Sequence, residues 1–150
     1  MNRAVLKKDF RLSAYLLISL ALAVPVVFWP LSLFVGTAPA VAGTIEKSWL
    51  IAACLLLLAA AISDSLLAGV ASLRQMLLHT IWIFITVAVV SLVLRESEGA
   101  YLLGIMFSLH ALRSAAPLWR HDSGWWLWPA WLRDTGMALS IFFWLALWPG

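Results

Sequence analysis

Charge and cysteine are both scarce in this chain. Only 11% of its 150 residues are charged, and Cys54 is its single cysteine. Soluble domains carry roughly 25% charged residues, and their surface helices need a polar face toward water. The composition therefore argues against a water-soluble fold. One cysteine also excludes an intrachain disulfide and a site built from several thiolates.

The motifs of familiar catalytic chemistry are absent as well. The sequence has no His-Glu-x-x-His motif, no nucleophile elbow and no phosphate-binding glycine loop. His121 and Asp122 are neighbours in a predicted loop, where adjacency alone does not indicate a catalytic pair. No internal repeat is visible, which disfavours an inverted-repeat transporter. Without a catalytic motif, we do not expect an enzyme. The net charge of +3 comes from residues at the ends of apolar segments, so we do not expect a nucleic-acid partner either.

Apolar residues make up 64% of the chain and gather in five stretches. A bilayer is crossed by about 20 apolar residues at 1.5 Å each. The sequence thus predicts an all-α, polytopic transmembrane helix bundle that forms one domain over residues 1–150, with short loops and a tryptophan-rich interfacial connector before the last helix. The expected spans are 12–34, 49–72, 76–94, 99–117 and 130–148. The first is too long for a cleaved signal, and a re-entrant last segment would leave four spans.

The basic residues are distributed unequally between the two sides of the predicted membrane. With the N-terminus in the cytoplasm, the inner side receives Arg3, Lys7, Lys8, Arg11, Arg74, Arg113, Arg120 and Arg133. The outer side receives only Lys47 and Arg95. This bias predicts an N-in, C-out protein of the cell inner (cytoplasmic) membrane. Arg133 and Asp134 are expected at the inner interface.

Four ionisable residues interrupt the spans: Asp64, His79, His110 and Arg113. At 1.5 Å per residue they lie at depths between about 5 and about 12 Å from the inner ends of their helices. Ionisable groups in lipid are costly and need a partner or a purpose. We therefore predict one polar layer on the cytoplasmic side, with an Asp64–Arg113 ion pair or an Asp64–His110 hydrogen bond.

Small residues recur at three- and four-residue intervals on two of the spans. Ala61, Ser65 and Gly69 form one stripe, and Gly104 and Ser108 belong to another. Such stripes let helices approach closely in lipid, so these five residues are predicted to pack helix against helix.

Half of the ten tryptophans gather between the fourth stretch and the start of the last. They are Trp119, Trp125, Trp126, Trp128 and Trp131. Indole prefers the headgroup region, where its ring is apolar and its N–H is wet. One interpretation is an aromatic belt with a connector on the inner leaflet. The other is a wall for a flat ligand such as a quinone or porphyrin.

Three functions remain open at this point. The near absence of mass outside the spans favours a structural or accessory subunit of a larger membrane complex, which contacts the lipid bilayer and other membrane subunits or copies of itself. A small oligomeric transporter or channel would use Asp64 and His110. An electron-transfer subunit would hold haem or a quinone with His79 and His110, and bis-histidine ligation needs both imidazoles to face one cavity. We expect no metal site and no resident cofactor.

Overall fold

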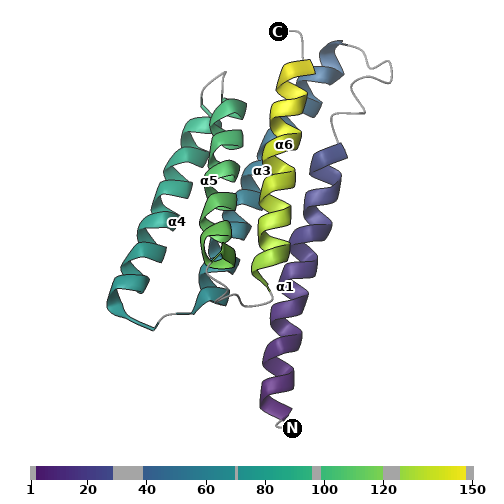
Figure 1. The fold of residues 1–150 in the computed structure, drawn as a ribbon. Helices are drawn as coiled ribbons and strands as arrows, with labels where there is room; N and C mark the ends of the chain where they lie inside the picture. The colour runs from purple at the N-terminus through teal and green to yellow at the C-terminus, as the bar shows by residue number, and fades with distance from the viewer. Residues whose placement is uncertain (1–2, 29–38, 70, 96–98, 120–125, 148–150) are drawn as a thin grey trace.

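The computed structural model of this chain describes residues 3–28, 39–69, 71–95, 99–119 and 126–147. Its helices are α1 (Arg3–Phe28), α3 (Pro39–Ala68), α4 (Leu73–Val93), α5 (Gly99–Trp119) and α6 (Leu127–Leu147), shown in Figure 1. The described residues contain no β-strand, so the predicted all-α class and helical bundle are confirmed.

Two of these helices are long and apolar enough to cross a membrane. They are the Lys47–Ala68 part of α3 and the whole of α4, Leu73–Val93. In α1 only the shorter apolar segment Leu17–Phe28 was found. The other two helices contain charged residues, Arg113 in α5 and the Arg133–Asp134 pair in α6, which lower their mean hydropathy. Each of the five predicted spans thus corresponds to a helix in the described part of the chain. Two of these helices are long and apolar enough to cross a membrane by length and composition alone.

The helices run alternately up and down, and α1 begins at the opposite end of the bundle from the end of α6 (Figure 1). The most extensive pairing is between α5 and α6, while α1 packs against α3 and α6. Helix α4 lies at the edge, against α3 and α5. Its buried residues, Thr86, Val90 and Val93, all belong to its second half. The first half of α4 therefore stands apart from its neighbours, which leaves room beside α3 and α5.

A glycine lies at the closest described contact of α5 with the side chains of α6. A Cβ atom added at Gly104 would lie 2.9 Å from Cζ of Phe142, closer than side chains tolerate. Ser108 belongs to the same helix, and its hydroxyl donates to the carbonyl of Gly104 at 2.9 Å. The fully buried Phe107 and Ile141 complete the contact. This close approach brings together α5 and α6, the two helices that carry His110, Arg133 and Asp134 of the site described below.

Two tryptophans complete the hydrogen bonding at the end of α1. The last carbonyls of a helix have no partner within it, and in lipid no water replaces one. Trp49 of α3 donates from Nε1 to the carbonyl of Val26 at 2.7 Å, and Trp144 of α6 donates to that of Val27 at 3.0 Å. These bonds join α1 to both of its neighbours.

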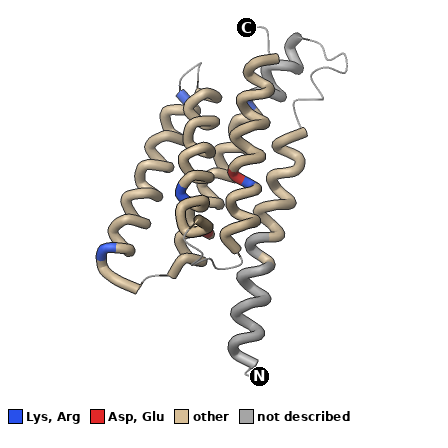
Figure 2. Tube along the Cα trace, viewed as in Figure 1, with Lys and Arg blue, Asp and Glu red and all other residues tan. Residues whose placement is uncertain are grey.

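Charged residues of the described part lie toward the helix ends, apart from a group inside the bundle where acidic and basic residues adjoin (Figure 2). Arg74 and Arg95 lie at opposite ends of α4, on the two sides that the charge bias predicts. The membrane orientation itself stays a prediction.

Candidate functional site

Four ionisable residues from three helices meet inside the bundle. Asp64 of α3, His110 of α5 and Arg133 and Asp134 of α6 are 4%, 1%, 3% and 0% exposed. We call these four residues the buried charge cluster. Burial of charge is strongly unfavourable unless the charge is paired and hydrogen-bonded, so the pairing within the cluster decides whether the arrangement is stable.

Arg133 stands at the centre of the cluster. Its Nη2 donates to Asp64 Oδ2 at 2.9 Å and to Asp134 Oδ2 at 3.1 Å, while its Nε donates to Asp134 Oδ1 at 2.8 Å. Its Nη1 donates to the hydroxyl of Ser19 at 3.2 Å. The planar guanidinium fork suits such simultaneous bonding, and the four bonds tie α1, α3 and α6 together around one cation.

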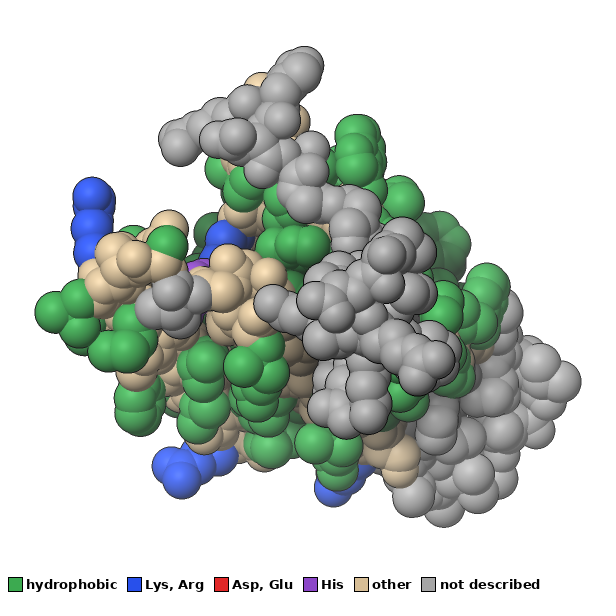
Figure 3. Space-filling model, turned by 90° about the horizontal axis from the view of Figure 1, so that it is seen from below, with side chains coloured by type: hydrophobic (Ala, Val, Ile, Leu, Met, Phe, Trp, Pro, Cys, Tyr) green, Lys and Arg blue, Asp and Glu red, His purple; other side chains and the backbone are tan. Residues whose placement is uncertain are grey.

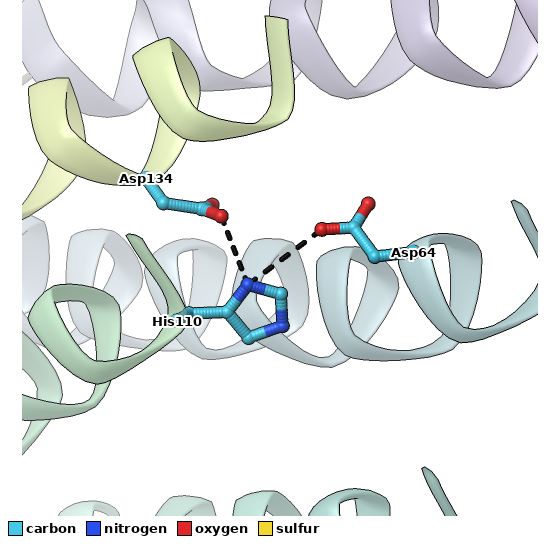
Figure 4. A group of neighbouring side chains, drawn as sticks. All are labelled: Asp64, His110 and Asp134. Atoms are coloured by element: carbon cyan, nitrogen blue, oxygen red, sulfur yellow. Dashed lines mark hydrogen bonds and ion pairs between the residues drawn. The ribbon is translucent and has the colours of Figure 1, made fainter. Parts of the chain in front are cut away.

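His110 completes the cluster from α5. Its Nδ1 lies 2.9 Å from Asp134 Oδ2 and 3.6 Å from Asp64 Oδ2 (Figure 4). Because an ionised carboxylate only accepts hydrogen bonds, Nδ1 carries a proton and donates it to Asp134. The other ring nitrogen, Nε2, lies on the far side of the ring from both carboxylates. It is buried and has no hydrogen-bond partner among the described residues.

The charges of the cluster do not balance when His110 is neutral. Two carboxylates face one guanidinium, which leaves one negative charge in a medium of low polarity. A second proton, on His110 Nε2, brings the total to zero. Arg113 adds a further positive charge to the wall of the cavity beside the cluster, so the two acids and two arginines together cancel when His110 is neutral. The unpartnered Nε2 is the position at which the ring can carry a second proton.

A metal ion is the other cation to consider. Donor atoms of Asp64, His110 and Asp134 lie within 4.8 Å of one another. The guanidinium of Arg133, however, already bonds to an oxygen of each carboxylate. A divalent ion there would meet a fixed positive charge and would have to displace those bonds. The arrangement suits a proton better than a metal.

A cavity of about 490 Å³ lies beside the cluster. Its polar lining comes from Asp64, Gln75, His79, His110, Arg113 and Ser114, and its apolar lining from Leu67, Ala68, Pro117, Trp126 and Leu127. It occupies the space beside the first half of α4. The view from the end where α1 begins shows a histidine side chain with a Lys or Arg side chain next to it (Figure 3), so this end of the bundle exposes part of the polar interior.

Arg113 places a second cation in the cavity wall. Its Nη2 donates to Nδ1 of His79, and its Cζ lies 5.1 Å from the centroid of the Trp82 ring. Its Nη1 is buried and has no hydrogen-bond partner, and no carboxylate in the described part of the chain lies within ion-pairing distance. Because His79 accepts at Nδ1, its ring proton is at Nε2.

All four residues of the predicted polar layer, Asp64, His79, His110 and Arg113, line this one cavity. Their pairing differs from the prediction. Asp64 is bound by Arg133, and Arg113 bonds instead to His79. The predicted hydrogen bond between Asp64 and His110 is not formed: His110 Nδ1 bonds to Asp134 Oδ2 at 2.9 Å and lies 3.6 Å from Asp64 Oδ2, beyond hydrogen-bonding distance.

The sequence predicts Arg133 and Asp134 at the inner interface, and the structure shows both side chains buried between the helices of the bundle. Their depth in a membrane stays a prediction. The prediction began the last span at residue 130, whereas α6 begins at Leu127. The pair therefore lies about 9 Å from the start of the helix. The sequence signal for this pair was the occurrence of two adjacent charged residues within the last of the five apolar stretches.

Residues predicted to pack the helices occupy different environments. Ala61 and Ser65 are buried, and the Ser65 hydroxyl donates to the Ala61 carbonyl at 2.7 Å. Gly69 follows the end of α3 and is exposed, with a φ of 67°. Glycine adopts that conformation readily, so Gly69 terminates the helix where a packing contact was expected.

Of the four clustered tryptophans that the structure describes, Trp126 lines the cavity. Trp119 ends α5 and is 87% exposed. Trp128 and Trp131 lie within the first two turns of α6, edge to face with centroids 5.9 Å apart. They are therefore helical and not part of a connector. Trp125 lies outside the described residues.

Comparison with protein-family models, with curated proteins and with solved structures gives no match to this chain.

Proposed function

We propose that this chain is a multi-pass protein of a cell inner membrane and that it works as a small proton-linked transporter. In this proposal the buried charge cluster binds the proton and the adjoining cavity binds the solute. The observation that carries it is the placement of His110, which is 1% exposed. One ring nitrogen contacts the carboxylates, and the unpartnered nitrogen belongs to a residue that lines the cavity.

The outer surface of the bundle supports the membrane assignment. Large apolar side chains are more than half exposed on all five helices, among them Leu17, Leu55, Phe84, Leu112 and Leu139. Helices α5 and α6 have 21 residues each, about 31 Å at 1.5 Å per residue. The charges of α6 are buried inside the bundle, which is where polar groups of membrane helices belong. These features favour five spans.

Protonation and solute occupancy are coupled through one imidazole ring. With Nε2 bare, His110 presents a hydrogen-bond acceptor toward its unpartnered side. With Nε2 protonated, it presents a donor, and the cluster becomes neutral. A solute that contacts this nitrogen therefore favours one protonation state. By linkage, the proton changes the affinity for that solute by the same factor.

A purely structural role leaves two features without an explanation. Membrane helices are well served by polar bonds between them, and Arg133 provides these. Four buried polar atoms nevertheless have no partner in the described residues: Nε1 of Trp82, Nε2 of His110, Nη1 of Arg113 and Oγ1 of Thr135. Only the two from His110 and Arg113 belong to residues that line the cavity beside the cluster. An unsatisfied buried donor or acceptor costs roughly 1–3 kcal/mol, so we read both atoms as ligand contacts.

The proposal can be tested with proteoliposomes that contain a pH-sensitive dye. Vesicles are mixed with a cation, an anion or a neutral solute, and luminal pH is followed for the wild type, His110→Gln and Asp64→Asn. We expect one solute class to change luminal pH only with the wild type. If no class does so, transport by this site is refuted. A Soret band that disappears in His110→Gln would instead support the haem alternative.

A further inference from the structure

We infer that the cavity binds an organic monoanion, a carboxylate with a small apolar body, and that binding takes up one proton at His110. This inference rests on the proposed function and names its substrate class. It is carried by two unpartnered polar atoms on α5 and by the charge count around them.

Arg113 supplies the charge that selects an anion. Its guanidinium is always protonated and has no carboxylate partner among the described residues. The contacts that it does make, with His79 and the Trp82 ring, leave Nη1 free. Guanidinium groups bind carboxylates through two parallel N–H donors. A carboxylate in the cavity would provide the missing partner.

His110 supplies the second contact. It precedes Arg113 by three residues on α5, a spacing that makes two side chains neighbours on a helix surface, and both residues line the cavity. A carboxylate has two oxygens, so one can accept from Arg113 Nη1 and the other from His110 Nε2. Because both nitrogens are buried without a ligand, the side chains must shift to admit the carboxylate. The second bond forms only if Nε2 carries a proton.

The buried charges require that proton for a second reason. The ionisable groups around His110 are Asp64 from α3, His79 from α4, Arg113 from α5, and Arg133 and Asp134 from α6, while α1 contributes the uncharged Ser19. With both histidines neutral, the two acids and two arginines cancel. An entering monoanion adds one negative charge, and a proton on His110 removes it. Uptake of anion and proton together is then electrically neutral.

The rest of the lining fits an apolar body. Leu67, Pro117, Trp126 and Leu127 contribute apolar surface to the same cavity. A second cavity of about 480 Å³ shares Ala68, Gln75, His79 and Arg113 with the first and adds Leu78 and Trp82. Arg113 thus borders two spaces. The acid could arrive from water or from the lipid phase, and the probes below distinguish these sources.

Calorimetric titration of the purified full chain in detergent provides the test. Benzoate is the water-soluble probe, dodecanoate the membrane-partitioned probe, and benzamide the uncharged match for benzoate. Each titration is run at one pH in two buffers of different ionisation enthalpy, which yields the number of protons taken up. We expect benzoate to bind with uptake of about one proton and benzamide not to bind. Stronger binding of dodecanoate would identify the lipid phase as the source.

Variants of Arg113 and His110 test whether these two residues contact the bound carboxylate. Arg113→Gln should weaken benzoate binding about tenfold or more, because a charge-assisted bond is lost, and Arg113→Lys should retain part of the affinity. His110→Gln should bind weakly with no proton uptake. Arg74→Gln, at an exposed site on α4, serves as the matched control. Circular dichroism identifies a variant that fails to fold, in which case Arg113→Lys carries the test.

The possible results distinguish failure of the carboxylate inference from failure of the transporter proposal. Benzoate binding without proton uptake, or benzamide binding as well as benzoate, overturns the inference. If neither acid binds but a cation or neutral solute changes luminal pH in the vesicle assay, the inference fails and the transporter proposal stands. If no solute class gives a response there, the transporter proposal fails as well, whereas proton-linked benzoate binding would show a binding site without transport.

Discussion

Removal of the central cation should be the most damaging single change in the bundle. Arg133→Gln takes away a guanidinium that makes four hydrogen bonds, three of them to carboxylates. Polar bonds between membrane helices average about 0.6 kcal/mol each, so the lost bonds alone amount to roughly 2 kcal/mol. Removal of one partner of a buried ion pair costs about 3–5 kcal/mol. The second effect dominates, since Asp64 and Asp134 would remain buried without a counter-charge.

We therefore expect Arg133→Gln to lower the free energy of unfolding by about 3–5 kcal/mol near neutral pH. The loss should be smaller in acid, where protonated carboxyl groups need no counter-charge. Equilibrium unfolding in mixed detergent and dodecyl sulfate micelles, followed by circular dichroism, measures it. The triple variant Asp64→Asn, Arg133→Gln, Asp134→Asn should recover part of the loss because it leaves no unpaired charge. An Arg133→Gln variant as stable as Arg74→Gln would refute this reasoning.

Two further changes test how the bundle is held together. Gly104→Val should destabilise the protein by about 1–3 kcal/mol, as expected of overpacking, and Gly136→Val, where an added Cβ meets nothing within 4 Å, is its control in the same unfolding assay. Trp49→Phe keeps an aromatic ring but leaves the Val26 carbonyl unpaired, so we expect a loss of about 1–3 kcal/mol, and unchanged stability would show that this bond to α1 is unimportant.

The helices themselves could be predicted because long apolar runs and lipid thickness determine where they lie. Helix α5, predicted at 99–117, spans Gly99–Trp119, and α4, predicted at 76–94, spans Leu73–Val93. The largest difference is the start of α3 at Pro39, ten residues before the predicted span. Pro39 lies in the segment expected to be a loop between the spans 12–34 and 49–72, yet proline fits the first turn of a helix. Gly69 then ends the helix before the predicted residue 72.

The polar site was only partly predictable, for a geometric reason. The depth of a residue along a helix follows from its residue number, so the sequence predicts one layer that contains Asp64, His79, His110 and Arg113. Residue number does not determine which helices are neighbours or how each helix is rotated about its axis. The predicted ion-pair partner of Asp64 is therefore Arg113, whereas in the structure Arg133 forms the ion pair with Asp64. Arg133 and Asp134 were not predicted as members of the cluster, because their burial depends on which face of α6 packs against the other helices.

The protonation state of the His110 ring tests the central claim most directly. Nitrogen NMR of histidine-labelled protein in lipid bilayers, with His110→Gln to assign the signals, reports which ring nitrogens carry a proton. At one fixed pH, we predict a proton at Nδ1 only in the ligand-free protein and protons at both nitrogens after benzoate is added. A ligand-free ring protonated at Nε2 and bare at Nδ1, or a ring that benzoate binding leaves unchanged, would contradict the account.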